Sequence, residues 1–208
     1  MRKLLLLPLA VLTILSACNA EEKQQSDAVQ ESSSEIVIST PEKEKIKTMS
    51  SSQNTPLKTG EWGIAAKYST SDQLYANVPV KITSVTYGEN AEKTVRSFMN
   101  ENPEYVYTKP LPTEQWTVAE YELSLDGFPL DETGADASIT SFVTAEDGGT
   151  ITVDEKIYNP FTVNIIDGQY RYEGIVSGKI AFRLPKNCGK YLIVVGEFEE
   201  TQAFFLPD

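Results

Sequence analysis

The chain has 208 residues, enough for one folded domain with flanking segments, and it carries 18 basic and 30 acidic side chains for a formal net charge of −12. It contains no histidine, which excludes Ser-His-Asp and Cys-His catalytic relays and zinc sites with histidine ligands. The negative charge repels polyphosphates and no glycine-rich phosphate-binding motif occurs, so we expect neither nucleic acid nor nucleotide as a partner.

The first eighteen residues read as an export signal. Arg2 and Lys3 precede an apolar stretch over Leu4–Leu15, which is shorter than the roughly 20 apolar residues of a membrane-spanning helix. The stretch closes with Leu15-Ser16-Ala17-Cys18, which resembles a bacterial lipobox. That resemblance implies cleavage before Cys18, a diacylglycerol on its thiol, and anchoring on the extracytoplasmic face of a bacterial cell membrane. The alternatives are an ordinary cleaved signal peptide and a membrane-retained anchor.

From Cys18 to Lys58 the sequence predicts a lipidated cysteine followed by a disordered tether. Residues 19–58 contain no aromatic side chain, so they cannot bury enough apolar surface to offset the entropy of ordering the chain. All the aromatic residues (2 Trp, 10 Tyr and 8 Phe) fall in Thr59–Asp208. We therefore expect a signal peptide over 1–17, the lipidated cysteine and tether over 18–58, and one folded domain over 59–208.

Most of the domain alternates apolar and polar residues with a period of two, which is typical of half-buried antiparallel strands. Gly- and Asn-containing turns separate the alternating segments. This spacing predicts an all-β fold, an immunoglobulin-like antiparallel β-sandwich. The expected strands cover residues 62–68, 78–82, 119–125, 138–144, 150–153, 162–166, 169–176, 180–184, 191–195 and 203–206. The continuous apolar run over 191–195 predicts a strand central to the core.

One segment repeats its apolar residues with helical spacing. From Ala91 they recur at i, i+4, i+7 and i+8, with Asn90 as the expected N-cap and Pro103 as the stop. We expect one short peripheral helix that covers an open end or an edge of the sandwich.

Several of these segments also resemble a known family. The resemblance lies in residues 83–89, 116–123, 174–185 and 191–196, together with the lipobox and the low-complexity tether. It is to the telokin-like, immunoglobulin-like domain of Gram-positive bacterial surface lipoproteins, over roughly Gly60–Leu206. The resemblance implies a sandwich fold and carries no catalytic residues with it. The chain departs from the family pattern by an acidic insertion over Phe128–Asp136.

Carboxylates are the abundant groups with potential chemistry. Asp126, Asp131, Glu132 and Asp136 crowd one loop, where they could bind calcium or act as a paired acid and base. Their spacing matches no EF-hand loop, and acidic residues in turns commonly serve local hydrogen bonds. We expect the turn role and predict no cofactor.

Aromatic side chains offer a second candidate site. Trp116, Tyr170 and Tyr172 could form a platform for a glycan or a peptide, and two residues that are two apart on a strand share one face. The alternative is a place in the core, which we expect because a sandwich of this size needs aromatic residues inside. We also expect Cys188 to be a buried, unreactive thiol.

These observations favour a non-enzymatic interaction module displayed outside the membrane, which binds an envelope or extracellular protein or glycan. A calcium- or carboxylate-dependent envelope hydrolase using the Asp126–Asp136 loop is one alternative. A structural envelope lipoprotein is the other.

Overall fold

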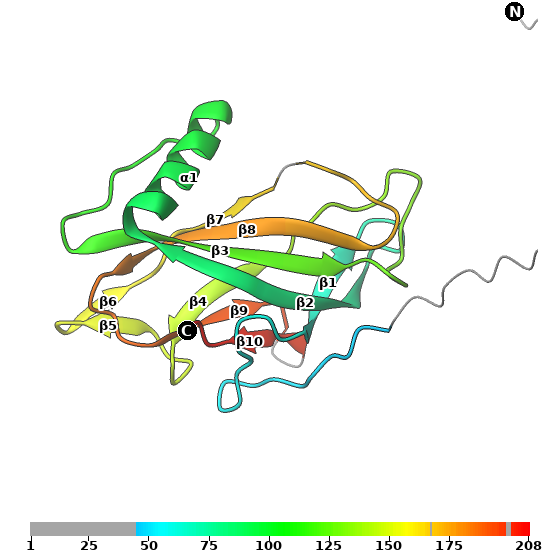
Figure 1. Ribbon diagram of the computed structural model, residues 1–208, viewed down its shortest axis with the longest axis horizontal. Helices are drawn as coiled ribbons and strands as arrows, with labels where there is room; N and C mark the ends of the chain where they lie inside the picture. Colours follow the sequence, from blue (N-terminus) through cyan, green and yellow to red (C-terminus); the bar gives the residue numbers. More distant parts are fainter. Residues whose placement is uncertain (1–44, 167, 199–200) are drawn as a thin grey trace, which may run out of the picture. The chain divides into compact units, whose positions relative to one another are not determined.

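The computed structural model describes residues 45–166, 168–198 and 201–208, and within them it is an all-β sandwich with one helix (Figure 1). A five-stranded antiparallel sheet has the order β1-β2-β3-β8-β7, a three-stranded sheet has the order β10-β9-β4, and β5-β6 form a small hairpin. The predicted fold class is confirmed. The elements are β1 (Gly63–Ser69), β2 (Leu74–Tyr87), α1 (Gly88–Glu101), β3 (Glu114–Ser124), β4 (Ser141–Ala145), β5 (Ile151–Val153), β6 (Lys156–Tyr158), β7 (Thr162–Ile165), β8 (Ile175–Pro185), β9 (Tyr191–Val195) and β10 (Ala203–Phe205).

The core lies between the two larger sheets and follows the predicted alternation. Tyr121 on β3 and Phe182 on β8 point inward and are fully buried, as is Ile193 on β9. All five residues of β9 are buried, as expected for the middle strand of its sheet. Burying an apolar side chain of this size stabilises the fold by roughly 1.5–3 kcal/mol.

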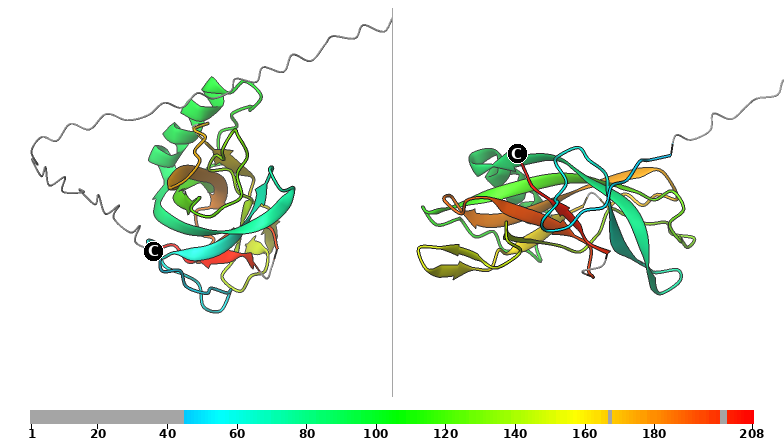
Figure 2. Two further views of the ribbon diagram at one scale, coloured as in Figure 1. Left: turned by 90° about the vertical axis from the view of Figure 1, so that its right-hand side faces the viewer. Right: turned by 90° about the horizontal axis from the view of Figure 1, so that it is seen from below.

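The two sheets curl around one core when seen along the long axis (Figure 2, left), and contacts at both sides of the sandwich join them to neighbouring segments. On one side Leu57 forms a parallel bridge to Phe205, with hydrogen bonds from Leu57 N to Phe204 O (2.8 Å) and from Leu206 N to Leu57 O (2.9 Å). On the other side the Asn164 amide of β7 donates to Ile139 O at 3.2 Å. The Leu57 bridge therefore covers part of the free edge of β10, where an unpaired strand edge would promote aggregation.

Residues before the predicted boundary at Thr59 belong to the domain. Leu57 is 3% exposed and belongs to the core, and Met49 N donates to Trp62 O at 2.8 Å. The boundary was placed too late because it was drawn from aromatic content, whereas a buried leucine and backbone hydrogen bonds tie this segment to the domain. The signal peptide, Cys18 and the tether up to residue 44 lie outside the described residues.

Helix α1 covers the outer face of the five-stranded sheet instead of an end or an edge. Its buried residues Ala91, Val95 and Met99 pack against Trp116 and Val118 of β3. The predicted N-cap was wrong: the helix begins at Gly88, its N-cap residue is Tyr87, and no side chain caps it. Among the described residues, no helix is long and apolar enough to cross a membrane.

Candidate functional site

Four loops meet at one end of the sandwich, the right-hand end in Figure 1. They are the β1–β2 turn, the segment between β3 and β4, the segment between β7 and β8, and the segment after β9. Two hydrogen bonds join the first pair: Ser69 Oγ donates to Pro129 O (2.8 Å), and Thr70 Oγ1 donates to Asp131 Oδ2 (3.1 Å). Together the loops enclose a cavity of about 440 Å³, here called the loop-end pocket. Its charged and tyrosine lining residues are Lys67, Tyr68, Tyr75, Asp136, Tyr170 and Glu197.

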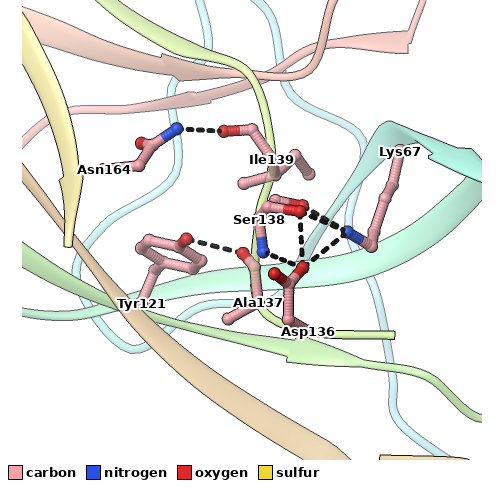
Figure 3. A network of polar contacts seen from close by, with 7 residues as sticks. All are labelled: Lys67, Tyr121, Asp136, Ala137, Ser138, Ile139 and Asn164. Atoms are coloured by element: carbon pink, nitrogen blue, oxygen red, sulfur yellow. Dashed lines mark hydrogen bonds and ion pairs between the residues drawn. The ribbon is translucent and has the colours of Figure 1, made fainter. Parts of the chain in front are cut away.

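Three strands of the large sheet fix the backbone that lines this pocket (Figure 3). The Tyr121 hydroxyl of β3 donates to Ala137 O at 2.6 Å, and the Lys67 ammonium of β1 donates to Ser138 O. The side-chain amide of Asn164 on β7 donates to Ile139 O. Because these side chains come from the packed sheet, residues 137–139 are held in one conformation without regular secondary structure of their own.

Lys67 is the buried cation of this network. Its side chain is 5% exposed, its Nζ lies 3.8 Å from Asp136 Oδ1, and it faces the Phe128 ring at 6.0 Å. Asp136 Oδ1 also accepts hydrogen bonds from Ser138 N (2.9 Å) and Ser138 Oγ (2.5 Å). Burial lowers the pKa of Lys67, and the carboxylate of Asp136 opposes that shift. The charge of Lys67 is therefore balanced inside the protein.

Aromatic rings form the rim of the pocket. Tyr68 and Tyr75 face each other across the β1–β2 hairpin with ring centroids 5.3 Å apart, and Phe198 lies 4.7 Å from Tyr75. Phe198 itself does not line the pocket, whereas Tyr170, from the segment between β7 and β8, does and is 59% exposed. A hydrogen bond to Glu197 raises the pKa of Tyr75. The rim thus combines exposed ring surface with a carboxylate.

The predicted acidic residues hold loops together through hydrogen bonds, some within their own turn and some to other loops. Asp126 Oδ1 accepts from Gly174 N (2.9 Å), and Asp131 Oδ1 accepts from Thr133 N (2.8 Å). Hydrogen bonds from Thr133 and Thr70 lower the pKa of Asp131. Glu132 contributes its backbone carbonyl, which accepts the Tyr172 hydroxyl. In the described part of the chain no three acidic or cysteine side chains gather as a metal site.

The three predicted aromatic residues do not form one platform. Trp116 is 1% exposed beneath α1, whereas Tyr170 and Tyr172 are 59% and 62% exposed. The expectation that the two tyrosines belong to the core was wrong, because residues 169–174 are a loop in which only Arg171 pairs, with Ala135. Of these three aromatic residues, Tyr170 alone lines the loop-end pocket.

Four residues of the pocket were not predicted from the sequence: Lys67, Tyr68, Tyr75 and Glu197. One signal was present: Lys67 follows Gly63 and Ala65 at inward-facing positions of β1, where an apolar residue is the norm. A charged residue at such a position requires a buried partner, and Asp136 supplies it from a loop far along the chain.

A second hollow, of about 880 Å³, lies beside α1 on the outer face of the sheet. Its one lysine is paired, since Lys179 Nζ contacts Glu120 Oε1 at 2.5 Å, and hydrogen bonds lower the pKa of Glu120. Cys188 is half-buried and burial raises the pKa of its thiol, the opposite of an activated nucleophile.

The loop-end pocket is therefore the strongest candidate site in the described residues, with fixed walls and an exposed aromatic rim. The chemistry that this pocket allows follows from the residues that line it. No protein-family model, no curated protein and no solved structure matches this chain.

Proposed function

We propose that the protein is a lipid-anchored, extracytoplasmic binding module that takes its ligand in the loop-end pocket. The observation that carries this proposal is the pairing of an open aromatic rim with a rigid polar base. Anchoring rests on the lipobox-like residues that end at Cys18, and the resemblance to surface lipoproteins points to the same location.

The aromatic rim supports binding on energetic grounds. Tyr68, Tyr75 and Tyr170 keep between 42% and 59% of their surface exposed, although the described part of the chain has a large apolar core. Tyrosine combines a large apolar ring with a hydroxyl and loses little conformational entropy when it is immobilised, which is why it is common in binding loops. An exposed group of such rings is a usable contact surface.

The base of the pocket supports binding through preorganisation. The backbone of residues 137–139 is already fixed by Tyr121, Lys67 and Asn164, so a ligand need not order it. Less ordering on binding means higher affinity for the same contacts. A volume of about 440 Å³ lies within the usual range for small-molecule sites.

The carboxylate-dependent hydrolase gains no support from this pocket. Hydrolysis of a glycan needs one carboxyl group as acid and another as base or nucleophile. Asp131 and Asp136 instead accept hydrogen bonds within their own turns, and Asp136 is also paired with Lys67.

The binding proposal is tested by NMR on the chain from Asn19 to Asp208, which lacks only the signal peptide and Cys18. Neutral oligosaccharides, muropeptides and small amines would be titrated one by one. We expect a ligand that shifts amide signals of the loop-end pocket and loses affinity in Tyr68→Ala. Phe161→Ala is the matched control, because Phe161 is equally exposed (50%) but does not line this pocket. Ligands that bind both variants equally would contradict the assigned site.

The anchoring proposal has its own test. Replacing Cys18 with Ala removes the acceptor thiol, so the protein should leave the membrane fraction of the producing cell. A variant that stays processed and membrane-bound would show that a lipid on this cysteine is not the anchor.

A further inference from the structure

Two tyrosines that line the loop-end pocket, Tyr68 and Tyr75, form a corner of three aromatic rings together with the neighbouring Phe198. Tyr68 and Tyr75 have ring planes 62° apart, and Tyr75 and Phe198 have planes 82° apart. All three side chains are at least 42% exposed. The face of an aromatic ring carries negative electrostatic potential, so the ring surface that these edge-to-face pairs leave exposed attracts a positive charge.

A carboxylate stands beside this corner. Glu197 is exposed, accepts a hydrogen bond from the Tyr75 hydroxyl, and accepts another from Thr140 Oγ1 at 3.0 Å. A carboxylate has about four acceptor positions, so two hydrogen bonds leave room for a charged donor. No cation among the described residues forms an ion pair with Glu197.

The remaining charges make the pocket unsuitable for an anion. Lys67 is the one cationic side chain in its lining, and Asp136 already balances that charge from within the protein. Asp131, next to the lining residues Thr70 and Thr133, adds a second carboxylate near the rim. The chain as a whole has a formal charge of −12, which draws cations toward it at low ionic strength.

We infer that the loop-end pocket recognises an organic ammonium group, either a quaternary ammonium or a protonated amine, held over Tyr68 and Tyr75 and paired with Glu197. The inference rests on the proposed binding function and narrows it to one ligand chemistry. Ring faces select the positive charge, and the carboxylate fixes where it lies.

The test compares two probes of almost identical shape. Choline carries the quaternary ammonium, and 3,3-dimethylbutan-1-ol replaces its nitrogen with carbon and is neutral. Each would be titrated into the Asn19–Asp208 chain and followed by NMR. A cation–aromatic contact predicts an affinity for choline about 2- to 30-fold higher than for the neutral probe, and a loss of that preference when Tyr75 is replaced by Leu.

Glu197→Gln isolates the carboxylate. It should weaken choline binding several-fold and leave the neutral probe unaffected. Glu146→Gln is the control, because Glu146 is an exposed carboxylate that pairs with Lys190 (3.3 Å) and does not line the pocket.

The outcomes separate this inference from the proposed function. Equal binding of both probes at the pocket would overturn the ammonium inference and leave the binding function standing. If neither probe shifts pocket signals at millimolar concentration, the ammonium inference is also wrong. The binding function is then decided by the oligosaccharides and muropeptides of its own titration series.

Discussion

Replacing Lys67 with Met tests whether the buried ammonium holds the wall of the loop-end pocket. Methionine keeps an unbranched side chain of similar length and removes the charge. The substitution leaves Ser138 O without its donor and Asp136 without its cation. Of the three side chains from the sheet that hold residues 137–139, Tyr121 and Asn164 should then remain.

The expected cost follows from what remains around Asp136. Removing one partner of a fully buried ion pair costs about 3–5 kcal/mol. Asp136 keeps 19% of its side-chain exposure and two hydrogen bonds from Ser138, so it stays partly solvated. We therefore expect the free energy of unfolding to fall by about 2–3 kcal/mol. Adding Asp136→Asn to Lys67→Met should recover part of this loss, because no unpaired carboxylate is left.

Urea unfolding of the Asn19–Asp208 chain measures these changes, and its pH dependence adds a second criterion. The pKa of Lys67 in the folded protein lies below 10.5, its ordinary value in the unfolded chain. Between the folded and the unfolded pKa, the unfolded chain therefore binds more protons than the folded one. The contribution of this group to stability therefore rises with pH up to about 10.5. The difference between wild type and Lys67→Met should widen over this interval. If wild type and Lys67→Met unfolded at the same urea concentration at every pH, the assigned network would be refuted.

Three further substitutions probe the packing that supports the site. Gly178→Ala would place a methyl group 2.5 Å from the hydroxyl oxygen of Tyr121. We therefore expect the free energy of unfolding in urea to fall by about 1–3 kcal/mol. The control Ser177→Ala, at an exposed position, should lower it by less than about 0.5 kcal/mol. Tyr121→Phe leaves Ala137 O without its donor and should cost about 1–3 kcal/mol. Burial raises the pKa of Tyr121 above 10, so its contribution is complete below pH 10 and declines above it; the difference between wild type and Tyr121→Phe should shrink in alkaline urea titrations. Leu57→Ala should cost about 2–5 kcal/mol, and an unchanged midpoint would show that residues before Thr59 do not belong to the fold.

Local patterns in the sequence predicted the central sheet well. Alternation along β3 and β8 specified which face each residue takes, because a strand turns its side chains to opposite faces at every step. The continuous apolar run of β9 placed that strand in the middle of its sheet. These properties are carried by neighbours in the chain, so one sequence suffices to read them.

Features that depend on distant partners or on unusual turns could not be read in this way. The role of Lys67 depends on Asp136, which lies in a different loop. Alternation at Tyr170 and Tyr172 imitates a strand, but Gly174 adopts φ +79° and the regular ladder starts only at Ile175. The β5–β6 hairpin turns at Asp154 and Glu155, both with positive φ and without the glycine or asparagine that usually marks such a turn.

The parallel bridge between Leu57 and Phe205 also has a mechanical consequence. If the chain is held at its N-terminal side, as the anchoring proposal requires, pulling on a bound ligand loads this bridge along the strand direction. The two backbone hydrogen bonds of the bridge would then have to break together in shear, and Leu57 would have to leave the core at the same moment. Resistance to such a load is set by the rate of unfolding and not by equilibrium stability. The short segment before β1 would thus resist forced unfolding of the domain when a bound ligand is pulled.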